Sequence, residues 1–292
     1  MYELVQAAEN TYYIQSPAKI GLVKSADREV CLIDSGNDKD AGKKVKKILD
    51  AQGWTLKAIY NTHSHADHIG GNMYLAAQTG CKVYAPGIER DFTEHPLLEP
   101  AFLYGGFPPK ALRHKFLMAQ ESCALPLTPD ALPQGWETIP LPGHSFDMVG
   151  FRTPDQVVFL ADCLSSEETI SKYQVSFLVD PEAYLNTLDR VQALNAALFI
   201  PAHAEPTTDI APLAQLNAAK VREIEEKIVA VCQTPQSFDS ILKTLFDDYA
   251  LEMTFEQHAL VGSTVRSYLT WLTDSGRLQT SISQNTLLWA AI

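Results

Sequence analysis

The chain has 292 residues, with 35 acidic and 23 basic side chains, a net charge of −12 and 46% hydrophobic residues. This length and apolar content suit one large domain, or a main domain with a smaller one, and exclude a disordered or collagen-like protein. Because affinity for nucleic acids and anionic membranes comes mainly from Lys and Arg, the acidic excess argues against a broad electrostatic grip on either.

The cysteines and the N-terminus bear on location. The five cysteines are scattered without a close pair, which argues against a disulfide framework and against a Cys-rich zinc site. The first residues do not form a signal peptide, and no apolar run approaches the roughly 20 residues of a membrane span. We therefore expect a reduced, cytoplasmic protein.

The first 86 residues alternate short strands with helices, as in a layered α/β core. Residues 40–52 place Val45, Ile48 and Leu49 on one helical face, and 73–79 predicts a second helix that ends at Gly80 as a left-handed cap. β-Branched and aromatic runs separated by polar turns predict strands at 12–15, 21–23, 30–33, 56–60 and 81–84.

Residues 87–133 interrupt this alternation with seven prolines, an aromatic loop at 102–107 and a basic cluster. A connection of this length inside a compact domain is usually functional, so we interpret it as a lid or excursion. Its cationic side chains either form a pocket wall for an acidic substrate or lie on a solvated helix face. Tyr104, Arg113 and His114 are the candidate substrate-binding residues of this segment.

The strand pattern resumes at 137–141, 148–153 and 157–161, followed by a helix at 181–195 and a strand at 197–201. From about Pro212 the pattern becomes helical, with helices predicted over 220–232, over 234–246 and, after a capping box of Thr254 and Gln257, up to Gly276. Residues 278–283 and 286–291 predict a terminal hairpin. Three helices and a hairpin resemble a winged helix, so we place a domain boundary between residues 211 and 212.

The strongest chemical signal is the run His63-Ser64-His65-Ala66-Asp67-His68, which holds three of the eight histidines. It follows the predicted strand 56–60, and functional sites in α/β folds gather at the carboxyl ends of strands. His63 and His65 can aim at one cation while Asp67 and His68 turn toward a second beside it. Imidazole and carboxylate are ligands that zinc, iron and manganese accept. Histidine-rich loops are often surface accidents, but this density and placement predict a metal site.

This motif resembles the His-x-His-x-Asp-His signature of the metallo-β-lactamase superfamily. Three further segments match the remaining ligand positions of that family in order: His144 in a Pro-Gly-His turn, Asp162 ending an apolar strand, and His203 after another apolar strand. Residues 32–36 are similar to the Asp-x-Gly segment that packs beneath the site in this family. The resemblance covers roughly residues 1–210 and implies an αββα sandwich with the site at one edge.

The resemblance also implies a dinuclear site. By the family pattern, metal 1 takes His63, His65 and His144, metal 2 takes Asp67, His68 and His203, and Asp162 bridges the two. A water held between two cations loses a proton near neutral pH, and Asp67 is the candidate catalytic residue that orients it. Zinc is the expected metal at both positions, with iron and manganese as alternatives, because ligands of nitrogen and oxygen alone suit all three.

Differences between the branches of the superfamily narrow the function. One class of antibiotic-hydrolysing members has Cys where Asp162 stands, and the diiron electron-transfer members have Glu in place of His65. The chain therefore looks like the glyoxalase II, lactonase and ribonuclease branches, and we favour hydrolysis of a small ester, thioester or lactone. The alternatives are a phosphodiesterase or ribonuclease, a persulfide dioxygenase with a single iron, and a DNA-binding module with an inert metal site.

The C-terminal charge bears on these alternatives. Residues 212–292 carry six Lys and Arg against nine Asp and Glu, whereas a winged helix that reads nucleic acid usually has a basic recognition helix. We interpret this region as a packing, substrate-gating or dimer element. The expected partner is a small-molecule substrate, with neither nucleic acid nor membrane, and a homodimer is the candidate assembly. Tyr173 and Phe177, which follow Asp162 along the chain, are further candidates for the substrate pocket.

Overall fold

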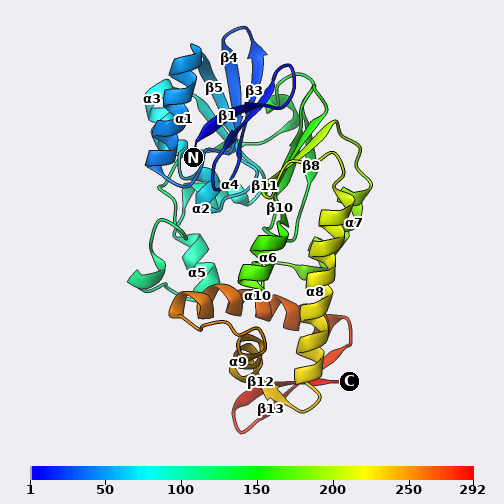
Figure 1. The fold of residues 1–292 in the computed structure, drawn as a ribbon. Coiled ribbons are helices and arrows are strands. Elements are labelled where there is room, and N and C mark those ends of the chain that lie inside the picture. The colour runs from blue at the N-terminus through cyan, green and yellow to red at the C-terminus, as the bar shows by residue number, and fades with distance from the viewer. Residues whose placement is uncertain (1) are drawn as a thin grey trace.

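The computed structural model describes residues 2–292 and has two β-sheets packed face to face between layers of helices (Figure 1). The first sheet contains, in spatial order, β1 (Glu3–Gln6), β2 (Thr11–Gln15), β3 (Ile20–Ala26), β4 (Glu29–Ile33), β5 (Thr55–Tyr60), β6 (Lys82–Ala85) and β7 (Leu125–Pro126). The second sheet contains, in spatial order, β11 (Leu198–His203), β10 (Val157–Ser165), β9 (Val149–Arg152) and β8 (Glu137–Pro140). The predicted αββα sandwich is confirmed.

Strand alternation explains how the sheets join the layers. Because successive side chains of a strand point to opposite faces, β4 sends Val30 and Leu32 toward the helices and Cys31 and Ile33 toward the second sheet. The helices on the outer face of the first sheet are α1 (Lys39–Gln52) and α3 (Asn72–Thr79), and those behind the second sheet are α7 (Pro181–Gln192) and α8 (Ala211–Val231). Three apolar layers therefore hold the sandwich together.

The predicted helices and strands of the N-terminal part are confirmed, with ends that differ by at most three residues. Helix α1 begins where the Asp38 carboxylate accepts hydrogen bonds from the amides of Asp40 and Ala41, and α3 ends at Gly80 in the left-handed conformation, with φ 71°. The sequence analysis missed β1, the four-residue α2 (Ala66–Ile69) and α6 (Glu167–Tyr173). Helix α6 buries only Ile170, so it lacks the apolar stripe by which a helix is recognised.

The segment 87–133 contains α4 (Glu89–Glu94), α5 (Leu98–Tyr104), two 3₁₀ turns (Lys110–Leu112 and Pro129–Ala131) and β7, which extends the first sheet. Its apolar residues Leu103 and Leu112 pack against Ala259 of the C-terminal helix α10 (Phe255–Asp274). Figure 1 shows α5 beside one end of α10. This excursion therefore connects the first sheet to the C-terminal region.

The C-terminal region contains α8, α9 (Phe238–Asp248), α10 and a third sheet in the order β12 (Gln236–Ser237), β14 (Thr286–Ala291), β13 (Leu278–Ser283). The predicted terminal hairpin is confirmed. The predicted start of a helix at residue 220 is wrong, because α8 begins at Ala211 and Pro212 lies in its first turn, where no amide donor is needed. Among residues 2–292, no helix combines the length and apolar character of a membrane span.

One hydrophobic core runs from the second sheet into the C-terminal region. Leu188 of α7, Val221 of α8, Leu245 of α9 and Tyr268 of α10 belong to the same buried cluster as Leu160 of β10. Helix α8 contributes to the core beside the second sheet and to the core of the C-terminal region, and Figure 1 shows it running from one to the other. The domain boundary at residues 211 and 212 and the winged-helix resemblance stay predictions.

Candidate metal centre

The histidine motif lies where β5 leaves the first sheet. The strand ends at Tyr60, and the chain then forms a loop and the short helix α2, of which His65 is the N-terminal cap. A Cβ atom on Gly70 would lie 2.0 Å from the carbonyl oxygen of Asn37, so only glycine lets this turn approach the segment after β4.

Residues from the second sheet complete the site. His144 lies in the turn between β8 and β9, where Gly143 has φ 122° and a Cβ atom would lie 2.4 Å from the backbone of Tyr184 at the start of α7. Asp162 was expected to end its strand, but β10 continues to Ser165. The left-handed φ of 49° at Ala161 and a shift of the β10–β11 register turn Asp162 out of regular pairing. His203 is the last residue of β11.

The seven predicted side chains meet in two groups that share Asp162. Within each group, one nitrogen or oxygen atom per residue lies within 4.8 Å of the others; the first group contains His63, His65, His144 and Asp162, and the second contains Asp67, His68, Asp162 and His203. These two sets correspond to the two halves of the family pattern.

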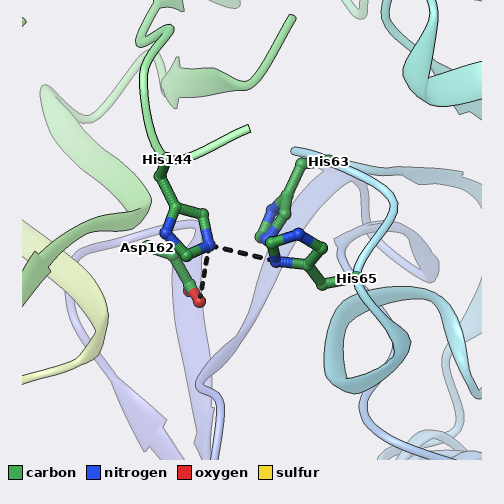
Figure 2. Close-up of side chains that lie close together, drawn as sticks. All are labelled: His63, His65, His144 and Asp162. Atoms are coloured by element: carbon green, nitrogen blue, oxygen red, sulfur yellow. Dashed lines mark hydrogen bonds and ion pairs between the residues drawn. The ribbon is translucent and has the colours of Figure 1, made fainter. Parts of the chain in front are cut away.

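In the first group, ring nitrogens point at one another (Figure 2). His65 Nδ1 lies 3.0 Å from His63 Nε2 and 3.0 Å from His144 Nε2. Asp162 Oδ2 lies 3.5 Å from His144 Nε2 and 3.3 Å from His203 Nε2, whereas its Oδ1 lies 2.9 Å from His68 Nε2. The Asp162 carboxylate therefore faces both groups.

This arrangement fits divalent cations. A neutral imidazole has one donor and one acceptor nitrogen, so three inward nitrogens at these distances cannot all be satisfied by hydrogen bonds to one another. Within residues 2–292, His68 Nε2 and Asp162 Oδ1 are buried and lack a hydrogen-bond partner, although they lie 2.9 Å apart. Buried polar atoms are normally paired, and imidazole and carboxylate are ligands of zinc, iron and manganese.

The outward nitrogen of each histidine also faces an oxygen atom. Such partners set the tautomer and the orientation of a metal-binding imidazole. The pairs are His63 Nδ1 with Thr62 Oγ1 at 3.0 Å, His68 Nδ1 with Asp34 Oδ2 at 2.7 Å, His144 Nδ1 with the Phe177 carbonyl at 3.1 Å, His203 Nδ1 with the Pro17 carbonyl at 3.0 Å, and His65 Nε2 with Glu99 Oε1 at 3.6 Å.

Asp34 links the segment after β4 to the motif. It has a left-handed φ of 64°, and its carboxylate accepts hydrogen bonds from the backbone amide and the hydroxyl of Thr62, each at 2.8 Å. The same carboxylate lies 2.7 Å from His68 Nδ1. The Asp34-Ser35-Gly36 segment thus lies against the motif, as the family resemblance implies.

The two groups differ in their electrostatics. Burial and the neighbouring histidines lower the pKa of His65 and of His144 to about 4, so both imidazoles stay neutral, which is the form that binds metals. Asp162, against the effect of burial, raises the pKa of His203 to about 10. Burial raises the pKa of Asp67, but His68 and His203 offset this and lower it to about 2. The carboxylates of the second group thus stabilise positive charge on the neighbouring imidazoles.

A cleft of about 1390 Å³ opens onto the site. Its wall includes Lys115 of the excursion, Tyr173 of α6, Phe177, and Leu260 and Val261 of α10. Both sheets and the C-terminal region therefore contribute to one cavity. Its lining combines these apolar side chains with many polar and charged ones, and a concave site of this size can hold a small molecule.

The candidate substrate residues lie in different places. Tyr173 lines the cleft, but Tyr104, Arg113 and His114 are not among the lining residues of the described chain. Tyr104 packs against the Phe255 ring, and His114 Nε2 lies 3.4 Å from Glu256 Oε1. These contacts hold the excursion against α10. Residue type alone did not reveal this role, because aromatic and basic side chains suit an internal contact as well as a ligand.

Two carboxylates of the excursion lie at the site without having been predicted from the sequence. Glu89 is fully buried and accepts hydrogen bonds from Ser64 and Ser145, which neighbour ligands of the first group. Glu99 lies beside His65, and burial, reinforced by the charge of Glu89, raises the pKa of Glu99 to about 8. No motif marks either residue, because their burial arises only when α4 and α5 pack onto the site.

Two sheets between helices, with adjoining His and Asp groups at the sheet ends, define a layered α/β protein with a candidate site for divalent ions. The model of the metallo-beta-lactamase superfamily matches residues 14–203, and the chain belongs to that superfamily.

Relatives and solved structures agree with this family. Hydroxyacylglutathione hydrolase of Hyphomonas neptunium is 30% identical over 115 residues, covering 38% of this chain and 35% of the relative. That of Methylococcus capsulatus is 50% identical over 46 residues, covering 16% and 18%. The chain thus spans about a third or less of these relatives.

Among solved structures, a beta-lactamase domain protein from Burkholderia ambifaria superposes with a TM-score of 0.78 at 20% identity, over 99% of this chain and 94% of that one. A metallo-beta-lactamase family protein from Thermus thermophilus superposes with a TM-score of 0.74 at 19% identity, over 97% and 99%. At these identities the likeness concerns the fold, and it extends through the C-terminal region.

Proposed function

We propose that the protein is a dinuclear metal-dependent hydrolase of a small ester, thioester or lactone. The observation that carries this proposal is the pair of ligand groups that share Asp162. His63, His65 and His144 would hold metal 1, Asp67, His68 and His203 would hold metal 2, and Asp162 would bridge them. Zinc is the proposed metal.

When bound, two divalent cations lower the pKa of a shared water toward neutrality and stabilise negative charge on the oxygen of the substrate carbonyl. Asp67 is the residue that we propose to orient the attacking water, since its side chain is 35% exposed and its Oδ2 lies 3.2 Å from His203 Nε2. His63 and His68 are fully buried and close the floor of the site to bulk solvent. Water therefore reaches the site from the cleft side.

The cleft supports a small acyl substrate. Phe177, Leu260 and Val261 offer apolar surface against which an acyl group would pack. The rest of the wall is polar and carries charges of both signs, with Lys172 near Glu167 and Glu168 and with Lys115 paired to Asp38 at 2.9 Å. The relatives named hydroxyacylglutathione hydrolase point to a thioester among the three substrate classes.

The lining of the cleft also supports a role for the C-terminal region. Because α10 contributes Leu260 and Val261 to the wall, we propose that residues 212–292 form a substrate-gating element. The five cysteines are unpaired in residues 2–292, which supports the proposed reducing, cytoplasmic location.

The test is a substrate panel on protein of known metal content. Elemental analysis of purified protein would count the bound ions, and the loaded protein would be assayed with acylglutathione thioesters, lactones, simple carboxylic esters, labelled RNA, a phosphodiester and a persulfide with oxygen. We expect two ions per chain and turnover of one of the first three classes. Turnover of RNA or the phosphodiester alone would support the nuclease alternative, and oxygen-dependent turnover of the persulfide would support a dioxygenase.

A further inference from the structure

We propose that Glu89 is a positioning residue that aligns the ligands of metal 1 by tying together two loops from different sheets. The inference rests on the dinuclear site of the proposed function. Glu89 is the first residue of α4 and has no exposed surface. It belongs to the excursion, so it reaches the site from outside both ligand-bearing sheets.

Each oxygen of the Glu89 carboxylate binds one loop. Oε2 accepts hydrogen bonds from the backbone amide of Ser64 at 3.0 Å and from its hydroxyl at 2.6 Å. Oε1 accepts from the Ser145 hydroxyl at 2.5 Å and from the Asp147 amide at 3.0 Å. Asp147 reciprocates, because its Oδ2 accepts a hydrogen bond from the Ile88 amide at 2.9 Å.

The two loops carry the three histidines of the first group. Ser64 lies between His63 and His65, and Ser145 directly follows His144. The gap that Glu89 bridges is therefore the one across which His65 Nδ1 and His144 Nε2 lie 3.0 Å apart. A shift of either loop would change the first group.

The two histidines of the second group have orienting partners other than Glu89. His68 is held by Asp34, and His203 lies 3.0 Å from the Pro17 carbonyl through its Nδ1. Loss of the Glu89 contacts should therefore weaken metal 1 more than metal 2. This asymmetry distinguishes a positioning role from a general contribution to folding.

A carboxylate is matched to these four donors, because it offers acceptor sites on both oxygens and has no donor when ionised. A glutamine has the same size, but its amino group would face either the Ser64 amide or the Asp147 amide. One buried N–H group would then lose its acceptor. Glu89→Gln thus changes hydrogen bonding with little change in volume.

The experiment compares Glu89→Gln with the intact protein by chelator competition, elemental analysis and the absorption spectrum of the cobalt-substituted site. Loss of a partner that orients a metal ligand typically costs 10- to 100-fold in affinity. We therefore expect metal 1 to dissociate about 10- to 100-fold more readily from Glu89→Gln than from the intact protein, while metal 2 is retained. The cobalt spectrum should change, and kcat should fall more than KM rises. Asp91→Asn, on the same helix with a half-exposed side chain, is the matched control and should behave like the intact protein.

Unchanged affinity for both ions in Glu89→Gln, or equal loss of both, would overturn the proposal. If this variant does not fold, Ser64→Ala and Ser145→Ala each remove one hydroxyl donor and should weaken the same ion by a smaller factor; no selective loss in either would equally overturn it. An intact protein that binds two ions but turns over no member of the substrate panel would refute the proposed function, while the metal affinities would still decide the role of Glu89.

Discussion

At the scale of single residues, the histidines of the first group differ in which ring nitrogen they turn inward. His63 and His144 present Nε2, whereas His65 presents Nδ1. The outward nitrogen explains this choice, because His65 Nε2 faces Glu99 while the Nδ1 atoms of the other two face Thr62 and the Phe177 carbonyl. Each inward nitrogen thereby remains free to act as a ligand.

His65→Ala tests the first group directly. Removing this imidazole should abolish binding of metal 1 and hydrolysis of the preferred substrate, because His65 Nδ1 lies against both other histidines of the group. The fold should persist, since the side chain caps α2 without a hydrogen bond to its backbone. Elemental analysis, turnover and circular dichroism measure these three properties.

The control for this variant is His258→Ala. His258 is half-exposed on α10, and its Nε2 lies 3.7 Å from Asp239 Oδ1, away from the ligand groups. We expect intact metal content and turnover. Turnover by His65→Ala at the rate of the control would refute the assignment of His65 as a ligand.

At the scale of elements, polar caps define where several helices begin. Backbone amides in the first turn of a helix lack partners within the helix, and a preceding Ser, Thr or Asp supplies an acceptor. The caps with this hydrogen bond are Asp38, Ser166, Asp180, Ser237 and Thr254. The capping interaction predicted at Thr254 is confirmed for the Gln257 amide, at 3.1 Å.

The cap of α1 should make stability depend on pH. The amide of Ala41 and the ammonium group of Lys115 lower the pKa of Asp38 in the folded protein, relative to about 3.9 in an unfolded chain. The contribution of the carboxylate is therefore present above the unfolded pKa and is lost as the pH falls through the folded pKa. Asp38→Ala should lower the free energy of unfolding by about 1 kcal/mol at pH 7, and by less below about pH 4.

Urea denaturation at pH 7 and at pH 3 measures this difference. Asp38→Asn is the matched control, because an amide oxygen still caps the helix but does not titrate. Its deficit relative to the intact protein should be smaller than that of alanine at pH 7. A deficit for Asp38→Ala that is equally large at both pH values would contradict the capping mechanism.

At the scale of the whole molecule, the ligand groups join parts of the chain that are distant in sequence. The motif follows β5 of the first sheet, whereas His144, Asp162 and His203 belong to the second. A cation bound by both sheets stabilises the folded chain, because the unfolded chain cannot assemble the same ligands. A metal ion at this site would therefore couple the two layers of the sandwich.

Removal of the metal should consequently lower Tm. A ligand at 100 times its Kd adds about 2.7 kcal/mol of stability, so chelation should produce a clear downward shift that zinc reverses. His65→Ala, which retains the second group, should show a smaller shift. Differential scanning calorimetry with and without chelator measures both, and a Tm indifferent to chelation in metal-loaded protein would contradict a metal shared by the two sheets.

The linear sequence was sufficient to predict the layered α/β class and the alternation of its strands and helices, because side-chain periodicity and turn residues are local signals. The dense motif at 63–68 marked a metal site in the same way, whereas His144, Asp162 and His203 were expected from the resemblance to the superfamily. The place of Asp162 within its strand was predicted wrongly. Asp162 owes its orientation to the left-handed conformation of Ala161 and not to the end of β10. Helix α8 was predicted too short, because Pro212 in a first turn looks the same in sequence as a break.

Contacts between distant segments were decided by tertiary packing alone. Tyr104 and His114 were predicted to contact substrate, yet they pack against α10, and the cleft is lined instead by residues such as Leu260 and Val261. Glu89 has an ordinary place in a polar segment of the sequence. It becomes an acceptor for four donors only because α4 docks between two loops, and burial of this kind is a property of the assembled fold.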